Sequence, residues 1–133
     1  RSATFTLTDP PAGEGVCIGG PLPPQPGDWH LKSWGRTRQI FASEGVEIWE
    51  SEGKAGHRTS LHRHPGHLQH LVPVVGKLLS ICGELSDDAT GGEQGIATMA
   101  GFEHELRFES DCRFIEVYAG QGSVMDTIER LYK

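Results

Sequence analysis

Histidine is the residue type that carries the clearest chemical signal in this sequence. The chain has 7 His among 133 residues, and most of them fall in one short stretch, as His57, His62, His64, His67 and His70. His62 and His64 are two positions apart, so on a β-strand both imidazoles point to the same face. Imidazole binds divalent transition metals well, and two imidazoles on one face can share an ion.

Two more side chains complete a possible set of metal ligands. Gln69 begins the apolar run that follows the Pro65–Gly66 turn, and His104 opens a later strand. The third and fourth ligands must then come from neighbouring strands. We therefore expect His62, His64, Gln69 and His104 to hold one divalent ion, whose identity among zinc, manganese, iron and nickel the residues leave open.

Such a set needs strands that project side chains from several directions, and the sequence has the pattern for them. From Trp29 onward, short segments rich in Val, Ile, Leu, Phe and Trp alternate with Gly, Asp and Ser turns. This pattern predicts an all-β, antiparallel sandwich or barrel with less than about 15% helix. We expect a surface loop at residues 86–92, and a final segment at 124–131 whose first half is a strand. The other strands are predicted at 38–43, 46–51, 60–64, 68–75, 77–83, 95–100, 104–109 and 112–119.

Length, composition and charge limit the other possibilities. The length fits one domain, and most of the 8 Pro lie in residues 9–28, so we predict an irregular Pro/Gly-rich arm over 1–28 and a barrel domain over 29–133. A formal net charge of −6 without a basic run argues against nucleic-acid binding. No apolar run reaches the roughly 18 residues of a membrane span. The 3 Cys, without a CxxC motif, favour reduced thiols and a cytoplasmic location.

The histidine stretch also resembles a known motif. Gly56, His62, His64, Gln69 and Gly76 have the spacing G-x5-H-x-H-x4-E-x6-G, which is the first motif of the cupin superfamily, with Gln in place of Glu. Residues 99–104, Met-Ala-Gly-Phe-Glu-His, resemble the second cupin motif, P-x-G-x2-H, with Met in place of Pro. The resemblance implies a jelly-roll β-barrel.

A narrower resemblance covers roughly residues 32–131. Residues 54–64, Lys-Ala-Gly-His-Arg-Thr-Ser-Leu-His-Arg-His, are similar to the K-P-G-x-R-L-S-L-Q-x-H segment of the cupin domain of type II mannose-6-phosphate isomerases. Trp34-Gly35 resembles the P-W-G entry of that family. Ile115-Glu116-Val117 and the ending with Asp126, Ile128 and Arg130-Leu131 resemble its I-E-V and D-I-V-R-L segments.

The departures from the family pattern change the expected chemistry. The first ligand position, Gln in the family, is His62 here, and the Glu position is Gln69. Three neutral imidazoles and an amide leave the charge of a divalent ion uncompensated, so the site should prefer an anionic or chelating oxygen ligand. A general base must then come from another residue. The candidates are Glu116, Glu105 and Glu103, with Arg58 or Arg107 available to bind a phosphate.

Three functions remain open at this point. The resemblance favours a metal-dependent isomerase or epimerase that acts on a sugar or sugar phosphate. The first alternative is an iron-dependent dioxygenase or a lyase of the small-cupin type, and the second is a metabolite-binding cupin without turnover. All three imply a small-molecule partner, anionic or carbohydrate, and the resemblance implies a homodimer.

Overall fold

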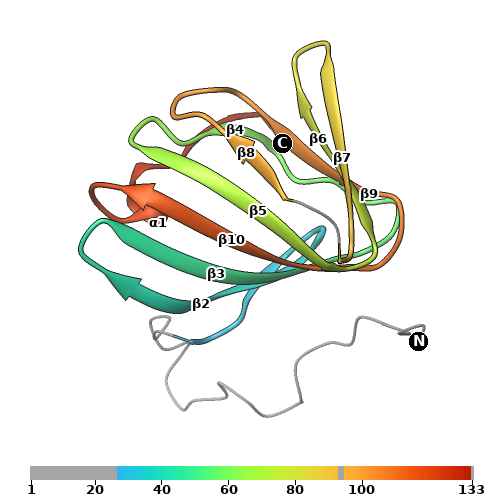
Figure 1. Ribbon diagram of the computed structural model, residues 1–133, viewed down its shortest axis with the longest axis horizontal. Coiled ribbons are helices and arrows are strands. Elements are labelled where there is room, and N and C mark those ends of the chain that lie inside the picture. Colours follow the sequence, from blue (N-terminus) through green and yellow to red (C-terminus); the bar gives the residue numbers. More distant parts are fainter. Residues whose placement is uncertain (1–26, 93–94, 133) are drawn as a thin grey trace, which may run out of the picture.

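The computed structural model describes residues 27–92 and 95–132 (Figure 1). Apart from Gly27 and Asp28, the irregular arm predicted at residues 1–28 lies outside the described residues. The described residues contain no helix that is long and apolar enough to span a membrane. The elements are β1 His30–Lys32, β2 Gly35–Ser43, β3 Val46–Gly53, β4 Leu61–Arg63, β5 His67–Val75, β6 Lys77–Cys82, β7 Leu85–Thr90, β8 Ile96–Thr98, β9 Glu105–Phe108, β10 Cys112–Gly120, α1 Val124–Thr127 and β11 Glu129–Tyr132.

The strands form two antiparallel layers, which lie one over the other in Figure 1. One layer is a six-stranded sheet in the order β1-β2-β3-β10-β5-β8. The other consists of β11-β4 and β7-β6-β9, which are joined by the bridges His62↔His104 and Arg58↔Arg107. The prediction of an all-β antiparallel fold is therefore confirmed.

The inner face of β10 changes from apolar to polar along its length. Phe114 is fully buried and stacks on Phe108, with ring centroids 5.7 Å apart. Glu116 and Tyr118 continue the same face by period two, and both are buried. One end of the interior is thus filled by hydrocarbon, while the other end is lined by polar groups. The larger apolar cluster contains Leu71, Leu78, Ala89, Leu106, Phe108, Cys112 and Phe114.

The predicted loop at residues 86–92 is wrong for most of its length. Residues 85–90 form β7, which pairs with β6 from Cys82↔Leu85 to Lys77↔Thr90. The first four residues of β7 are exposed, so no buried apolar face marks them as a strand. Backbone pairing to β6 outweighs their low strand propensity.

The first half of the final segment is a helical turn rather than the predicted strand. Ser123 precedes α1, and its carbonyl accepts hydrogen bonds from Thr127 N–H at 3.1 Å and Thr127 Oγ1 at 2.8 Å. The Val124 N–H donates to Glu47 Oε2 at 2.8 Å, and this bond holds α1 against β3. The buried Glu47 carboxylate, supplied by a distant strand, is the partner that local sequence patterns do not reveal.

Candidate metal centre

The side chains of His62, His64 and His104 converge on one region of the interior. His62 and His104 are paired across two strands through backbone bonds, His62 N–H to His104 O at 3.0 Å and His104 N–H to His62 O at 2.8 Å. Residues directly opposite in an antiparallel pair place their side chains side by side. His64 joins them from the next inward position after His62, and potential ligand atoms of the three lie within 4.8 Å of one another. This arrangement could hold a metal ion.

Backbone carbonyl groups set the tautomers of two of these imidazoles. His62 Nδ1 lies 2.7 Å from Ser60 O, and His104 Nδ1 lies 3.1 Å from Phe102 O. A carbonyl only accepts hydrogen bonds, so each Nδ1 carries the proton and donates. The Nε2 lone pair of each ring is therefore free, which is the state that a metal ligand requires.

Burial keeps all three rings uncharged. Removal from water and, to a smaller extent, the nearby His104 ring together lower the pKa of His62 to about 4. Burial, together with His62 and His104, lowers the pKa of His64 to about 3. The pKa of His104 is also lowered by burial. The three side chains are thus neutral donors at physiological pH.

Buried polar atoms without a hydrogen-bond partner are concentrated at the same place. Within residues 27–92 and 95–132, these orphan atoms are His64 Nδ1 and Nε2, His67 Nδ1, Gln69 Oε1 and His104 Nε2. Each such atom costs about 1–3 kcal/mol when nothing binds it. All but one belong to residues predicted as metal ligands, so the donor set fits a divalent ion.

A hydrogen-bonded network next to the histidines contains Gln69, Glu116 and Tyr118. Gln69 Nε2 donates to Glu116 Oε2 at 2.5 Å and to Tyr118 OH at 3.3 Å. Tyr118 OH donates to the same Oε2 at 2.5 Å, and Ser51 Oγ donates to Glu116 Oε1 at 2.9 Å. The amide nitrogen of Gln69 must face the carboxylate, because its oxygen would be repelled there. The register explains the contact, since Tyr118 lies opposite Gln69.

Burial raises the pKa of Glu116, against the opposing effect of its three hydrogen-bond donors. The pKa of Tyr118 is raised well above its ordinary value by burial and by the charge of Glu116. The Tyr118 ring packs edge-on against His64, with centroids 4.9 Å apart. A carboxyl group with an upward-shifted pKa therefore lies one side chain away from the histidine cluster.

The inner cavity, a pocket of about 60 Å³ inside the barrel, brings some of the predicted residues together. Its lining includes His62, His64, Glu116 and Tyr118. Sequence reasoning missed Tyr118, although its position two residues after Glu116 was a usable signal, because both side chains must then share the inner face of one strand.

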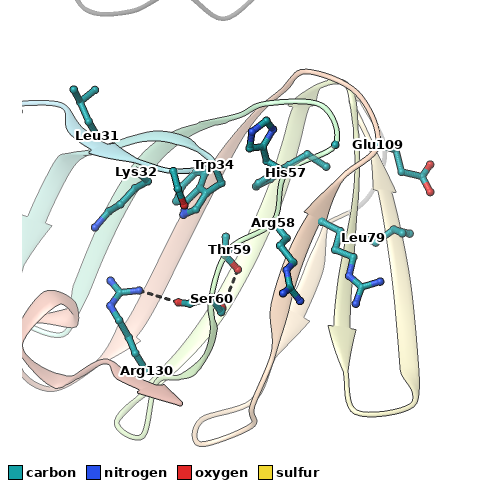
Figure 2. A pocket seen from close by; sticks show the side chains of 14 residues that line it. Leu31, Lys32, Trp34, His57, Arg58, Thr59, Ser60, Leu79, Glu109 and Arg130 are labelled. Carbon is teal, nitrogen blue, oxygen red and sulfur yellow. Dashed lines mark hydrogen bonds between the residues drawn. The ribbon is translucent and has the colours of Figure 1, made fainter. Parts of the chain in front are cut away.

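Glu105 and Arg58, the other two predicted catalytic residues, do not line the inner cavity. They pair with each other, Arg58 Nη1 to Glu105 Oε2 at 3.4 Å, and Arg107 Nη2 approaches Glu105 Oε1 at 3.3 Å. Arg58 instead lines the outer cavity, an open groove of about 1080 Å³ shown in Figure 2. Glu105 follows the inward-facing His104 directly, and alternation along the strand turns its side chain outward.

Comparison with known proteins identifies the fold. The structure resembles oxalate decarboxylase from Bacillus subtilis with a TM-score of 0.70 and 19% identity, covering 79% of this chain and 30% of that chain. A structure of that enzyme that concerns its Mn(II) centres matches with a TM-score of 0.68 and 20% identity, over 78% and 30% of the two chains. The fold is the cupin jelly roll.

A second cupin match is closer in length. KdgF from Halomonas sp. superimposes with a TM-score of 0.65 and 15% identity, over 74% of this chain and 90% of that chain. No protein-family model matches the sequence, and no curated protein matches it. This chain spans about a third of oxalate decarboxylase, so the comparisons concern its cupin fold. The narrower resemblance to mannose-6-phosphate isomerases remains a prediction.

Proposed function

We propose that this cupin is a metal-dependent isomerase or epimerase of a small sugar or sugar phosphate. His62, His64 and His104 bind one divalent ion through nitrogen, and Gln69 binds it through Oε1. The orphan atoms of His64, Gln69 and His104, together with the proximity of His62 to the other two histidines, support this ligand set. Bound there, the ion would polarise a carbonyl and an adjacent hydroxyl group of the substrate.

The single observation that carries the proposal is the position of Glu116. It is the predicted base that lines the same cavity as His62 and His64. Its raised pKa brings its proton affinity closer to what a general base needs near neutral pH. Isomerisation moves one proton from carbon to a neighbouring carbon and another between the two oxygens, without net oxidation. Glu116 can take up the carbon-bound proton and return it, while Tyr118 and Ser51 hold its carboxylate in place.

Hydrogen exchange into substrate tests the proposal directly. The Mn²⁺-loaded protein is incubated in D₂O with a panel of aldose and ketose phosphates, and the C–H signals next to the carbonyl are followed by NMR. We expect deuterium to enter one substrate, and the Glu116→Gln variant to lose at least about a hundredfold in rate. Exchange at an unchanged rate in Glu116→Gln would rule out Glu116 as the base.

A lyase or an iron-dependent dioxygenase is the second candidate. The neutral ligand set favours an anionic chelating substrate, and the fold matches that of oxalate decarboxylase, whose Mn(II) centres have been described. Metal analysis and gas exchange separate the two proposals. Carbon dioxide release or oxygen uptake with a carboxylate substrate, together with no deuterium exchange, would favour this alternative. Binding without any turnover would instead identify a metabolite-binding cupin.

A further inference from the structure

We infer that Lys32 and Arg130 form an anion-binding subsite at the mouth of the inner cavity, which takes the carboxylate or phosphate group of a small substrate. The inference deepens the proposed function. It rests on that function in one respect, which is that the reacting end of the substrate lies at the histidines while its anionic group lies at Lys32 and Arg130. Neither residue was predicted as part of the site.

The two cavities adjoin at these residues. Lys32, Trp34, Thr59 and Arg130 line both the outer groove and the inner cavity. Figure 2 shows the Lys32 amine and the Arg130 guanidinium extending toward one another beside Ser60. Both cations therefore lie where the outer groove and the inner cavity adjoin.

Lys32 and Arg130 differ from the other Lys and Arg residues that line the two cavities in having no ion pair within the described residues. The exposed Lys54 has none either, but it lines neither cavity. Most Lys and Arg side chains of the described chain have a carboxylate partner, as Arg58 and Arg107 have in Glu105. Within residues 27–92 and 95–132, neither Lys32 nor Arg130 forms an ion pair. Arg130 Nη1 donates to Ser60 Oγ at 3.1 Å, which orients the guanidinium without neutralising it.

The electrostatic influence of Arg130 reaches the metal centre. Burial, and then the positive charge of Arg130, lowers the pKa of Lys32. The same guanidinium adds to the effects that lower the pKa of His62 and His64. Two like charges that repel each other at a cavity mouth are stabilised by an anion between them. The attraction for an anion is local to these two residues, because the chain as a whole has a formal net charge of −6.

The size of the inner cavity limits how a substrate can lie. About 60 Å³ accommodates only a few atoms beyond the space for one water molecule. The reacting end of a substrate fits there, while its charged group stays at the mouth. Arg130 offers a planar fork for two oxygens, and Lys32 offers a point charge. Phosphate and carboxylate both meet this requirement.

Calorimetric titration of the metal-free protein tests the subsite separately from the metal. The probes are inorganic phosphate and malonate, at low ionic strength. We expect one of them to bind at a single site, and the stronger one identifies the preferred group. Lys32→Met and Arg130→Met should each weaken binding about tenfold, which is a loss of about 1.4 kcal/mol. Arg130→Lys keeps the charge but loses the planar fork, so it should weaken binding less than Arg130→Met does. Raising the salt concentration should weaken binding in the wild type.

Two control variants remove a positive charge elsewhere. Lys54→Met changes the net charge equally, at an exposed residue that lines neither cavity. Arg107→Met removes an ion-paired cation from the outer groove. Both should bind the probe within about twofold of the wild type. Equal losses in the controls, unchanged affinity in a folded Lys32→Met/Arg130→Met variant, or no binding of either probe would overturn the subsite.

The outcomes separate the subsite from the proposed function. Anion binding that depends on Lys32 and Arg130, without deuterium exchange on any substrate, would leave the subsite standing and remove the isomerase. Exchange that proceeds equally well in the Lys32→Met/Arg130→Met variant would leave the isomerase standing and remove the subsite.

Discussion

At the scale of single residues, the site combines polar atoms that have a hydrogen-bond partner with polar atoms that have none. His62 and His104 each use one ring nitrogen on a backbone carbonyl and keep the other free. Gln69 uses its amide nitrogen on Glu116 and Tyr118, while its oxygen has no partner within the described residues. This division favours a metal ligand over a residue whose only role is to hydrogen-bond in the barrel wall.

The Gln69→Leu variant tests that division. It removes the amide oxygen from the metal and the amide donor from the Glu116 carboxylate. We expect metal affinity to fall by at least about tenfold, or about 1.4 kcal/mol, measured by competition with a chelating dye. The matched control is His70→Leu, an exposed neighbour on the same strand whose side chain points outward, and it should bind metal as the wild type does. Unchanged affinity in Gln69→Leu would remove Gln69 from the ligand set.

The pH dependence of the metal-free protein follows from the histidines. In the unfolded chain His62 and His64 take up protons near pH 6.5, but in the folded chain their pKa values are about 4 and about 3. Between these limits the unfolded state binds more protons, so stability is lost as the pH falls from about 6.5 toward 4. We expect the melting temperature to drop over that window, and to drop less in His64→Leu. Parallel curves for the two proteins would contradict the assigned burial of His64.

The shared inward face of His62 and His64 could be predicted from sequence, because two residues that are two positions apart on a strand point to the same side. Lys32 and Arg130 could not be predicted, because they are brought to one cavity mouth from opposite ends of the domain. Arg58 and Arg107 looked equally suitable in the sequence, and only the position of Glu105 between them shows that they are already paired.

At the scale of elements, tight turns hold the strands in the register that aligns the site. Gly76 joins β5 to β6 with a φ of +84°, a backbone conformation that side chains disfavour. A Cβ atom there would also lie 2.2 Å from the carbonyl oxygen of Asp111. The strands predicted at 68–75 and 77–83 leave Gly76 as their link, as observed. The dependence of this link on Asp111 was not predicted, because that residue precedes a distant strand.

Gly76→Ala should therefore destabilise the protein more than a comparable turn variant. Gly83→Ala is the matched control, since Gly83 has a φ of +64° but open space at the Cβ position. We expect Gly83→Ala to cost about 1–2 kcal/mol from the left-handed conformation alone, and Gly76→Ala to cost clearly more because the Asp111 backbone must move. Chemical denaturation measures both. Equal decreases in the free energy of unfolding would mean that the Asp111 backbone moves away at no measurable cost.

The two segments whose type was predicted incorrectly share one physical cause. β7 is exposed along most of its length, and α1 is held by a hydrogen bond to the buried Glu47 on β3. Both are stabilised by partners distant in sequence rather than by their own propensity or periodicity. β5 and β10, which each have a buried face, were predicted within one residue of their observed ends, whereas β2 begins three residues before its predicted start.

At the scale of the whole molecule, the interior is divided between an apolar cluster and a polar cavity. The apolar cluster around Phe108 and Phe114 stabilises the barrel through burial of hydrocarbon. This stabilisation offsets the cost of the nitrogen and oxygen atoms in the polar half that have no hydrogen-bond partner. Metal binding should then stabilise the native state by mass action. At a free ion concentration of about 100 times Kd, the gain is about 2.7 kcal/mol. A rise in melting temperature with added Mn²⁺ or Zn²⁺, absent in His64→Ala, would agree with this division.

The metal content of the loaded protein tests the central claim most directly. The wild type, His62→Ala/His64→Ala and the outward-facing control His70→Ala are stripped with chelator, dialysed against Mn²⁺ and then against buffer, and analysed for metal per chain. The account predicts one ion per chain in the wild type and in His70→Ala, and almost none in His62→Ala/His64→Ala while that variant remains folded. One ion per chain in the folded double variant, or no ion in the wild type, would contradict it.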